Sequence, residues 1–289
     1  MMQQTSPIAA SGMLKLGGDL NIYRLGFGSM RLTGPGIWGP PENKAEALAV
    51  LRRAVELGIN FIDTADSYGP EVSENLIAEA LYPYPQGLVI ASKGGYARPG
   101  PDEWVPDGRP EHLREALEGS LKRLRLERID LYQFHTPDPK VPFERSVEAL
   151  ARLREAGKIR HLGLSNVTDD QLKRARSMVP IVSVQNRYNL VDRTSEDMVD
   201  ICEREGLAFI PWFPLAAGAL ARPGGQLEKI AQAHNATTSQ VALAWLLRRS
   251  RTMLPIPGTS KVKHLEELVA AAEIPLSEHE SQALTALRP

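Results

Sequence analysis

The hydrophobic positions of the chain follow two alternating patterns. Short apolar runs such as 87–93 and 128–135 are typical of buried strands, whereas leucines in 109–126 recur at the spacing of one helical face. Strands are predicted at 24–29, 59–63, 87–93, 128–135, 158–165, 180–186, 207–212 and 252–258. Helices are predicted at 44–58, 71–81, 109–126, 142–157, 168–178, 194–206, 226–235, 237–249, 263–273 and 277–287.

This regular alternation predicts the fold. About eight strand–helix units over roughly 250 residues indicate an α/β protein with a closed (β/α)8 TIM barrel, with a doubly wound open sheet as the alternative. A β-hairpin around Gly17 and Gly18 precedes the barrel, and 277–287 forms an extra C-terminal helix. No Ser-rich or Pro-rich linker divides residues 13–289, so we expect one barrel domain. Residues 1–12 lack the basic and apolar regions of a signal peptide, which predicts a disordered leader.

The composition argues against several classes of binding partner. Of 289 residues, 34 are Lys or Arg and 35 are Asp or Glu, so the formal net charge of −1 gives no overall attraction to nucleic acid or to an anionic membrane. No window approaches eighteen consecutive apolar residues, so no membrane span is expected. The single cysteine, Cys202, cannot form an internal disulfide and fits a reducing cytoplasm. Nothing in the sequence indicates an oligomeric state.

Polar side chains end three consecutive predicted strands. Asp63, Lys93 and His135 each stand at the carboxyl end of a strand, and Tyr68 follows in the loop after Asp63. Catalytic groups of (β/α) barrels gather at these ends, and neighbouring parallel strands lie about 4.8 Å apart. We therefore expect Lys93 between Asp63 and His135, with Tyr68 bending back over it.

These four side chains predict acid–base chemistry. A phenol has a pKa near 10, and a nearby ammonium such as that of Lys93 is expected to lower the pKa of Tyr68. Tyr68 then acts as the general acid for an oxygen that gains negative charge, Asp63 keeps Lys93 charged, and His135 orients the substrate oxygen. Taken singly, each residue also fits a solvated loop position or a salt bridge. A metal-dependent hydrolase using Asp63 and His135 is the weaker alternative, because no further ligands cluster at strand ends.

Phosphate binding is predicted late in the chain. The glycines of "LGFGSMR", Gly26 and Gly28, do not complete a Rossmann fingerprint. Barrels often bind phosphate with the loops after strands 7 and 8, here 214–225 and 257–264. The second loop offers hydroxyls and cations at a helix start, where backbone N–H groups add to them. A helix cap followed by exposed lysines is the alternative for this stretch.

These motifs together identify a family resemblance. The stretches "NFIDTADSYG", "ASKGG", "LYQFH", "GKIRHLGLSN", "SVQNRYN" and "IPGTS" resemble signatures of the aldo-keto reductase superfamily, over about residues 24–270. The resemblance implies an NADP(H)-dependent enzyme that reversibly reduces an aldehyde or ketone, with Asp63, Tyr68, Lys93 and His135 in the roles above. The stretches "TGPGIWGPP", "EALYPYP" and "PWFPL" are most similar to bacterial pyridoxal reductase (pyridoxine 4-dehydrogenase)-like members, which suggests pyridoxal as the substrate.

The resemblance also implies a cofactor site. Ser165, Asn166 and Gln185 would bind the nicotinamide carboxamide, and Trp212 would stack on its ring in place of the usual tyrosine. The remaining implied NADP(H) positions are Gly28, Met30, Leu215, Gly218, Thr259, Ser260, Lys261, His264 and Glu267. Two positions depart from the family: His264 replaces a common arginine, which loses a bidentate phosphate contact, and Leu268 replaces an asparagine near the adenine. Lys261 and Lys263 still favour NADPH.

A long loop at the barrel mouth predicts the substrate pocket. The loop 94–109 carries Tyr96 and Trp104, which with Trp38 and Phe213 would form an aromatic wall. Packing of these rings on the barrel rim is the alternative. A different class of function is an NADP(H)-binding sensor or regulatory subunit, as in family members that serve as β subunits of potassium channels. The complete set of four catalytic residues favours turnover.

Overall fold

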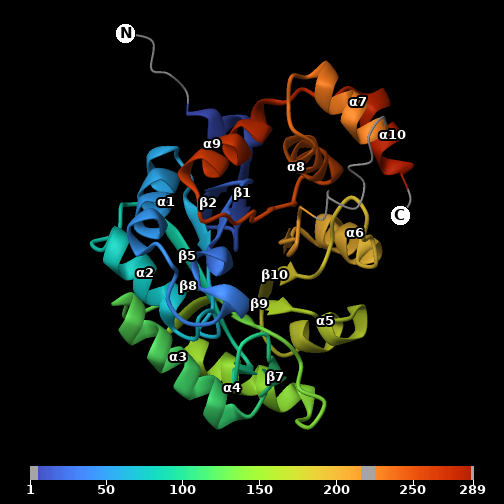
Figure 1. Cartoon of the computed structure of the whole chain (residues 1–289). Coiled ribbons are helices and arrows are strands. Elements are labelled where there is room, and N and C mark those ends of the chain that lie inside the picture. Colours follow the sequence, from blue (N-terminus) through green and yellow to red (C-terminus); the bar gives the residue numbers. More distant parts are fainter. Residues whose placement is uncertain (1–5, 216–224, 288–289) are drawn as a thin grey trace.

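The computed structural model describes residues 6–215 and 225–287, and its core is a closed ring of parallel strands (Figure 1). Seven strands are hydrogen-bonded in the order β11-β10-β9-β8-β5-β4-β3, all parallel. They are β3 (Phe27–Gly28), β4 (Phe61–Asp63), β5 (Val89–Gly94), β8 (Ile129–Phe134), β9 (Ile159–Ser165), β10 (Ile181–Gln185) and β11 (Ala208–Phe209).

The eighth position in the ring is taken by residues 252–257. Their backbone bonds β11 on one side, with Leu254 N donating to Phe209 O at 2.8 Å, and β3 on the other, with Gly28 N donating to Pro257 O at 3.1 Å. Pro255 and Pro257 have no N–H to donate, so this segment makes no regular ladder although it closes the barrel. The predicted (β/α)8 barrel is confirmed, and the open sheet is not formed.

Helices cover the outside of the ring of strands, as the predicted alternation of strands and helices requires (Figure 1). Several begin with a side chain that accepts from the first turn, such as the capping box of Thr168 with Gln171. The helices are α1 (Lys44–Glu56), α2 (Val72–Leu81), α3 (Pro110–Leu124), α4 (Phe143–Glu155), α5 (Asp169–Arg176), α6 (Glu196–Glu205), α7 (Gln226–Ala233), α8 (Thr238–Arg249), α9 (Val262–Ala270) and α10 (Glu278–Thr285). The predicted extra C-terminal helix is α10, which lies beside α7 and α8 (Figure 1).

The predicted N-terminal hairpin is also formed, by β1 (Met13–Leu16) and β2 (Leu20–Tyr23). Its Leu16 and Ile22 are buried with inward residues of the strands such as Phe61 and Leu131. Gly17 of the turn lies against His161, near the start of β9, so the hairpin covers the amino-terminal end of the barrel. Only the end formed by the carboxyl ends of the strands is left for chemistry.

The segment before the hairpin differs from the expected leader. Pro7–Ser11 form a short 3-10 helix, and Ile8 is completely buried in the main core. Ser6 Oγ also donates to Leu57 O just after α1, so residues 6–12 pack against the barrel. None of the helices in the described parts of the chain is long and apolar enough to cross a membrane.

Candidate active site

Strand alternation places a polar layer inside the barrel mouth. On β5 and β8 the residues Lys93 and Gln133 are register partners, and both side chains are buried. On the next strand Gly163 stands beside Gln133, and a Cβ there would lie 2.2 Å from Ser183 Oγ and 2.9 Å from Gln133 Cγ. The missing side chain therefore leaves the space that these polar groups need.

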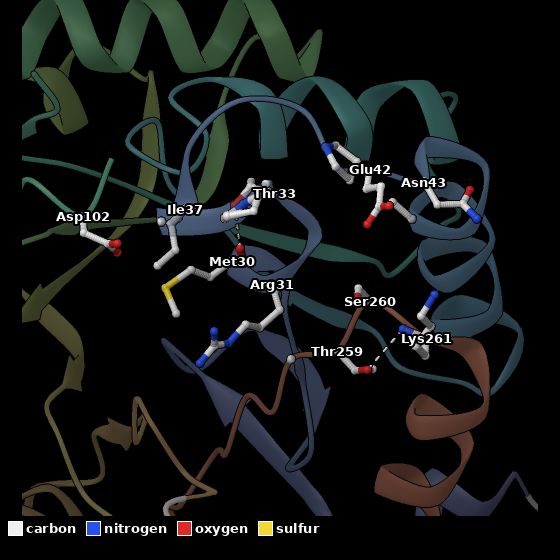
Figure 2. Close-up of a pocket in the computed structure, with 16 residues that line it drawn as sticks. Met30, Arg31, Thr33, Ile37, Glu42, Asn43, Asp102, Thr259, Ser260 and Lys261 are labelled. Carbon is white, nitrogen blue, oxygen red and sulfur yellow. Dashed lines mark hydrogen bonds between the residues drawn. The ribbon is translucent and has the colours of Figure 1, made fainter. Parts of the chain in front are cut away.

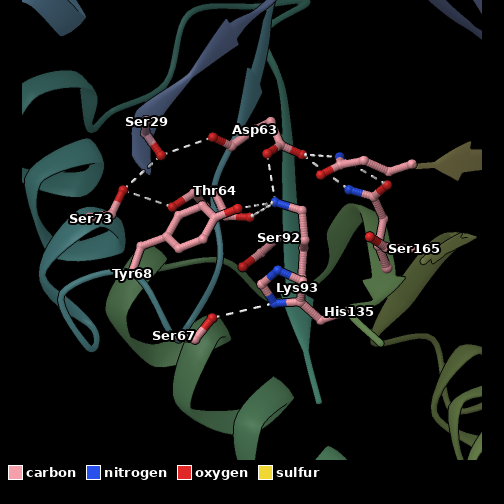
Figure 3. Close-up of polar contacts among 12 residues, drawn as sticks. Ser29, Asp63, Thr64, Ser67, Tyr68, Ser73, Ser92, Lys93, His135 and Ser165 are labelled. Carbon is pink, nitrogen blue, oxygen red and sulfur yellow. Dashed lines mark hydrogen bonds and ion pairs between the residues drawn. The ribbon is translucent and has the colours of Figure 1, made fainter. Parts of the chain in front are cut away.

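The Lys93 ammonium is the centre of this layer (Figure 3). It donates to Asp63 Oδ1 at 2.6 Å, to Thr64 O at 2.8 Å and to the Tyr68 hydroxyl at 3.0 Å, which uses its three hydrogens. Lys93 is 0% exposed and Asp63 is 1% exposed. Burial lowers the pKa of Lys93, but Asp63 and Tyr68 together raise it above its usual value, so the ammonium stays charged.

The second oxygen of Asp63 has partners that the sequence analysis did not assign to it. Asp63 Oδ2 accepts from Gln185 Nε2 at 2.9 Å and from Gln133 Nε2 at 3.1 Å. A glutamine inside an apolar strand, as in "DLYQFH", is the signal that could have revealed Gln133. Gln185, predicted to bind the nicotinamide carboxamide, thus holds the Asp63 carboxylate in place.

Tyr68 reaches Lys93 from the loop between β4 and α2. Gly69 next to it has φ +107, and a Cβ there would lie 2.4 Å from Val72 Cβ, so the turn requires glycine. The predicted net lowering of the phenol pKa is wrong. Burial raises the pKa of Tyr68 above its usual value, Lys93 lowers it and Asp63 raises it again. Lys93 lowers the pKa of Tyr68 as expected, but burial in the low-dielectric site raises this pKa by more. Tyr68 is therefore a neutral phenol at pH 7.

His135 stands at the end of β8, beside the Tyr68 ring, with the ring centroids 5.8 Å apart. Burial lowers its pKa well below the usual histidine value, and the charges of Lys93 and Arg98 lower it further. The imidazole is therefore neutral. Its Nδ1 lies 3.3 Å from Ser67 Oγ (Figure 3), a contact that the sequence analysis missed.

The four predicted substrate-pocket aromatics separate into three places. Tyr96 and Trp104 pack edge-on against His135, at centroid distances of 4.7 and 6.2 Å. Trp38 lies further out, with its ring 5.7 Å from the Arg98 guanidinium. Phe213 is 45% exposed and lines the cavity over Tyr68. Of the four rings predicted to form the wall, Tyr96 and Trp104 pack on His135, Trp38 lies near Trp104 across the Arg98 guanidinium, and Phe213 stands at the cavity edge.

A cavity of ≈ 230 Å³ opens over these groups. Asp63, Tyr68, Gln185 and Trp212 line it, together with Gly28 of β3 and Met30 just after that strand. The Trp212 indole N–H donates to Asn166 Oδ1 at 2.9 Å, which holds the ring at the cavity edge. Asn166 Nδ2 in turn donates to His135 O at 3.0 Å and to Ser165 Oγ at 3.2 Å. The Ser165 hydroxyl thus acts as an acceptor here, and no bond that it donates is found among the described residues.

Two further cavities adjoin this one. A cavity of ≈ 290 Å³ shares Leu215 and Gly258 with it and is lined by His264 and Glu267, as well as by Leu268. A cavity of ≈ 590 Å³ shares Met30, Arg31 and Gly258 with the first one. Figure 2 shows Arg31, Ser260 and Lys261 among the side chains that line the larger cavity.

Two of these cavities share lining residues and so form an extended site. A groove runs from Trp212, past Leu215 and Gly258, to Glu267, with apolar, amide and hydroxyl groups along it. Lys261 and His264, predicted side by side at the 2′-phosphate, line different cavities that share Thr259. Gly218 lies outside the described residues.

The start of α9 differs from the predicted phosphate site in one respect. The backbone N–H of Val262 already donates to the Glu46 carboxylate at 3.2 Å, so this first-turn donor is engaged by the protein itself.

Among the described residues, no three His, Cys, Asp or Glu side chains form a group able to hold a metal ion.

Comparisons with known proteins agree with this geometry. The model of the aldo/keto reductase family matches residues 24–289. The chain is 55% identical over 267 residues to an uncharacterized oxidoreductase of Schizosaccharomyces pombe, covering 92% of this chain and 87% of the relative. It is 43% identical to the pyridoxine 4-dehydrogenase of Escherichia coli, covering 90% and 93% of the two chains. An aldo/keto reductase of Klebsiella pneumoniae, solved with NADP and acetate, superposes with a TM-score of 0.77 at 25% identity, covering 94% and 93% of the chains.

Proposed function

Because the chain belongs to the aldo/keto reductase family, whose members reduce carbonyl groups with NADP(H), we propose that pyridoxal is its substrate and that Asp63, Tyr68, Lys93 and His135 carry out the reaction. The observation that carries the assignment of residues is the bond from the buried Lys93 ammonium to the Tyr68 hydroxyl at 3.0 Å, beside the ≈ 230 Å³ cavity.

The proposed chemistry follows from the charges at this point. When bound, NADPH supplies the hydride that adds to the carbonyl carbon. The Tyr68 hydroxyl donates its proton to the carbonyl oxygen as that oxygen becomes negative. Lys93 stabilises the phenolate left on Tyr68, and Asp63 holds the ammonium in position and charged. Neutral His135 donates a hydrogen bond that orients the same oxygen.

The chain's own residues also support a binding mode for NADP(H). We assign the carboxamide to Ser165, Asn166 and Gln185, and the face of the nicotinamide to Trp212. The remaining proposed contacts are Gly28, Met30, Leu215, Gly218, Thr259, Ser260, Lys261, His264 and Glu267. The larger cavity with Lys261 and the narrower one with His264 both reach Thr259, so Thr259 is the proposed anchor of the phosphate.

Two observations support pyridoxal. A relative that covers most of the chain is a pyridoxine 4-dehydrogenase, which interconverts an alcohol and its carbonyl on a small aromatic ring. The site also offers flat surfaces at Phe213 and Trp212 around the ≈ 230 Å³ cavity. A cytoplasmic location stays part of the proposal and rests on the single buried cysteine, Cys202.

The test is NADPH oxidation, followed by its absorbance, against a panel of pyridoxal, small aliphatic aldehydes, benzaldehydes and ketones. Pyridoxal should have the highest kcat/KM of the panel. Tyr68→Phe should bind NADPH like the wild type and lose roughly a hundredfold to ten-thousandfold in kcat. Turnover by Tyr68→Phe within a few fold of wild type would remove Tyr68 from its role. Tight NADPH binding with no turnover of any carbonyl would favour a cofactor sensor.

A further inference from the structure

Three loops at the barrel mouth meet at one guanidinium. Arg98 donates from Nη1 to Ser67 O at 2.7 Å, from Nη2 to Gly36 O at 3.0 Å and from Nε to Glu103 O at 2.7 Å. These carbonyls belong to the loop that carries Tyr68, to the segment after β3 and to the loop after β5. A planar fork of fixed donors suits such separated acceptors, whereas a lysine can reach only part of them.

The same guanidinium lies over an aromatic ring. The Arg98 Cζ atom is 3.7 Å from the centroid of Trp104. Trp104 in turn contacts Tyr68 and His135 edge-on, at centroid distances of 6.3 and 6.2 Å. Arg98 therefore holds the Trp104 ring, which packs on two of the proposed catalytic groups, Tyr68 and His135. Arg98 itself does not line the cavity over Tyr68.

Arg98 also controls Ser67, the residue that meets His135. Arg98 holds the Ser67 carbonyl, and the Ser67 hydroxyl lies 3.3 Å from His135 Nδ1. A neutral imidazole has one N–H, and which nitrogen carries it is decided by the bond that the other nitrogen makes. If Ser67 donates to Nδ1, the hydrogen must reside on Nε2, the nitrogen that has no partner among the described residues and can donate to a carbonyl oxygen.

We propose that Arg98 is a positioning residue that fixes the orientation and the Nε2–H tautomer of His135 through Ser67 and Trp104. The proposal rests on the proposed function, since it gives His135 the task of donating to the substrate oxygen. The loops that Arg98 joins are already in contact: Gly36 has φ +67, and a Cβ there would lie 2.9 Å from Pro101 Cβ. The guanidinium is thus part of a preformed arrangement, which is what a catalytic hydrogen bond requires.

The first experiment reads the tautomer directly. The protein is labelled with nitrogen-15 in its histidine imidazoles, and the His135 signals are assigned by their disappearance in His135→Ala. The NMR spectrum should show the His135 hydrogen on Nε2 alone. Arg98→Met should give a mixture of tautomers, and Ser67→Ala should do the same while the Arg98–Trp104 contact remains. The matched control is Arg109→Met, because Arg109 lies in the same loop and, among the described residues, its side chain bonds Asp107 and none of the groups around His135. The control should leave the His135 signals unchanged.

The second experiment is kinetic. A catalytic group displaced by about 1 Å can lose roughly a hundredfold in rate, so we expect Arg98→Met to lower kcat by about ten- to a hundredfold, with the dissociation constant of NADPH unchanged within about twofold. Arg98→Lys should lie between Arg98→Met and the wild type. The pKa of His135 in Arg98→Met should rise, because burial and the charge of Lys93 still lower it but the charge of Arg98 is gone, while Tyr68 and Tyr96 still pack beside it.

Each outcome decides the proposal. A wild-type His135 with hydrogen on Nδ1, or an unchanged tautomer in both Arg98→Met and Ser67→Ala, overturns it. Should Arg98→Met fail to fold, Arg98→Lys and Ser67→Ala carry the same comparison in folded protein. A tautomer that shifts while the rate of Tyr68→Phe stays normal would support the role of Arg98 and reject the proposed catalytic role of Tyr68, so the two failures are distinguishable.

Discussion

Replacing Asp63 with asparagine removes one charge from the centre of the site while it keeps the size of the side chain. Asp63 is the only carboxylate within ion-pairing distance of the Lys93 ammonium among the described residues, at 2.6 Å. It also accepts from Gln133 and Gln185 through its second oxygen. An asparagine amide would instead point a donor at Lys93 or at the two glutamine amides, so the variant loses both the charge and at least one hydrogen bond.

The size of the effect follows from burial. Lys93 is 0% exposed, so water cannot replace the lost partner. Removal of one partner from a buried ion pair typically costs about 3–5 kcal/mol, because the other charge remains uncompensated. That is a large part of the roughly 5–15 kcal/mol by which most domains are stable. We expect Asp63→Asn to lower the free energy of unfolding by this amount at pH 7, and kcat by about a hundredfold or more.

The pH dependence gives a second, independent prediction. In the wild type the pKa of Lys93 is raised, so its stabilising contribution is present below the usual lysine pKa, near 10.4, and is lost as the pH rises through the folded-state value. In Asp63→Asn the larger of the two interactions that oppose burial is lost and only that with Tyr68 remains, so burial depresses the pKa of Lys93 and the variant becomes more stable as the pH rises. The difference in stability between the two proteins should therefore shrink as the pH approaches about 10.

The assay is urea unfolding at several pH values, with kcat for the best carbonyl measured on the same preparations. Asp130→Asn is the matched control, because Asp130 pairs with Arg160 at 3.3 Å in a partly exposed position and should cost no more than about 1 kcal/mol. An Asp63→Asn protein with wild-type stability and a kcat within a few fold would refute the reasoning. Lys93 would then not depend on Asp63 for its charge.

Three further predictions concern other parts of the site. Lys261→Ala should raise the dissociation constant of NADPH and barely affect that of NADH; equal losses would show that Lys261 does not contact the 2′-phosphate. Binding of NADPH should quench tryptophan fluorescence, and Trp212→Phe should keep activity and lose most of the quench; an unchanged quench would reject stacking on Trp212. Burial raises the pKa of Asp66 to about 8, and the Glu74 charge adds to this, so stability is highest when Asp66 is protonated and falls as the pH rises from about 4 to 8. Asp66→Asn should remove that part of the pH dependence in urea unfolding, and an identical pH profile would show that Asp66 is ionised in the folded protein.

Much of this protein could be predicted from local patterns. Apolar periodicity and glycine positions are local properties, so the alternation of strands and helices, the first hairpin and α10 were all predictable from the sequence. The polar residues that end three strands predicted a shared site, because parallel strands in a barrel present the same end to solvent. The hydrogen bonds of Lys93 with Asp63 and Tyr68 follow from that placement.

What remained depended on contacts between residues far apart in the chain. The sequence marks Gln133 as a polar residue in an apolar strand, but no spacing reveals that Gln133 and Gln185 both bond Asp63, or that three loops meet at Arg98. The net direction of the Tyr68 pKa was misjudged, since the sequence shows the charge of Lys93 but not the depth of burial that outweighs it. Charge and periodicity belong to each segment of the sequence, whereas desolvation and hydrogen-bond geometry exist only once the strands and loops are packed together.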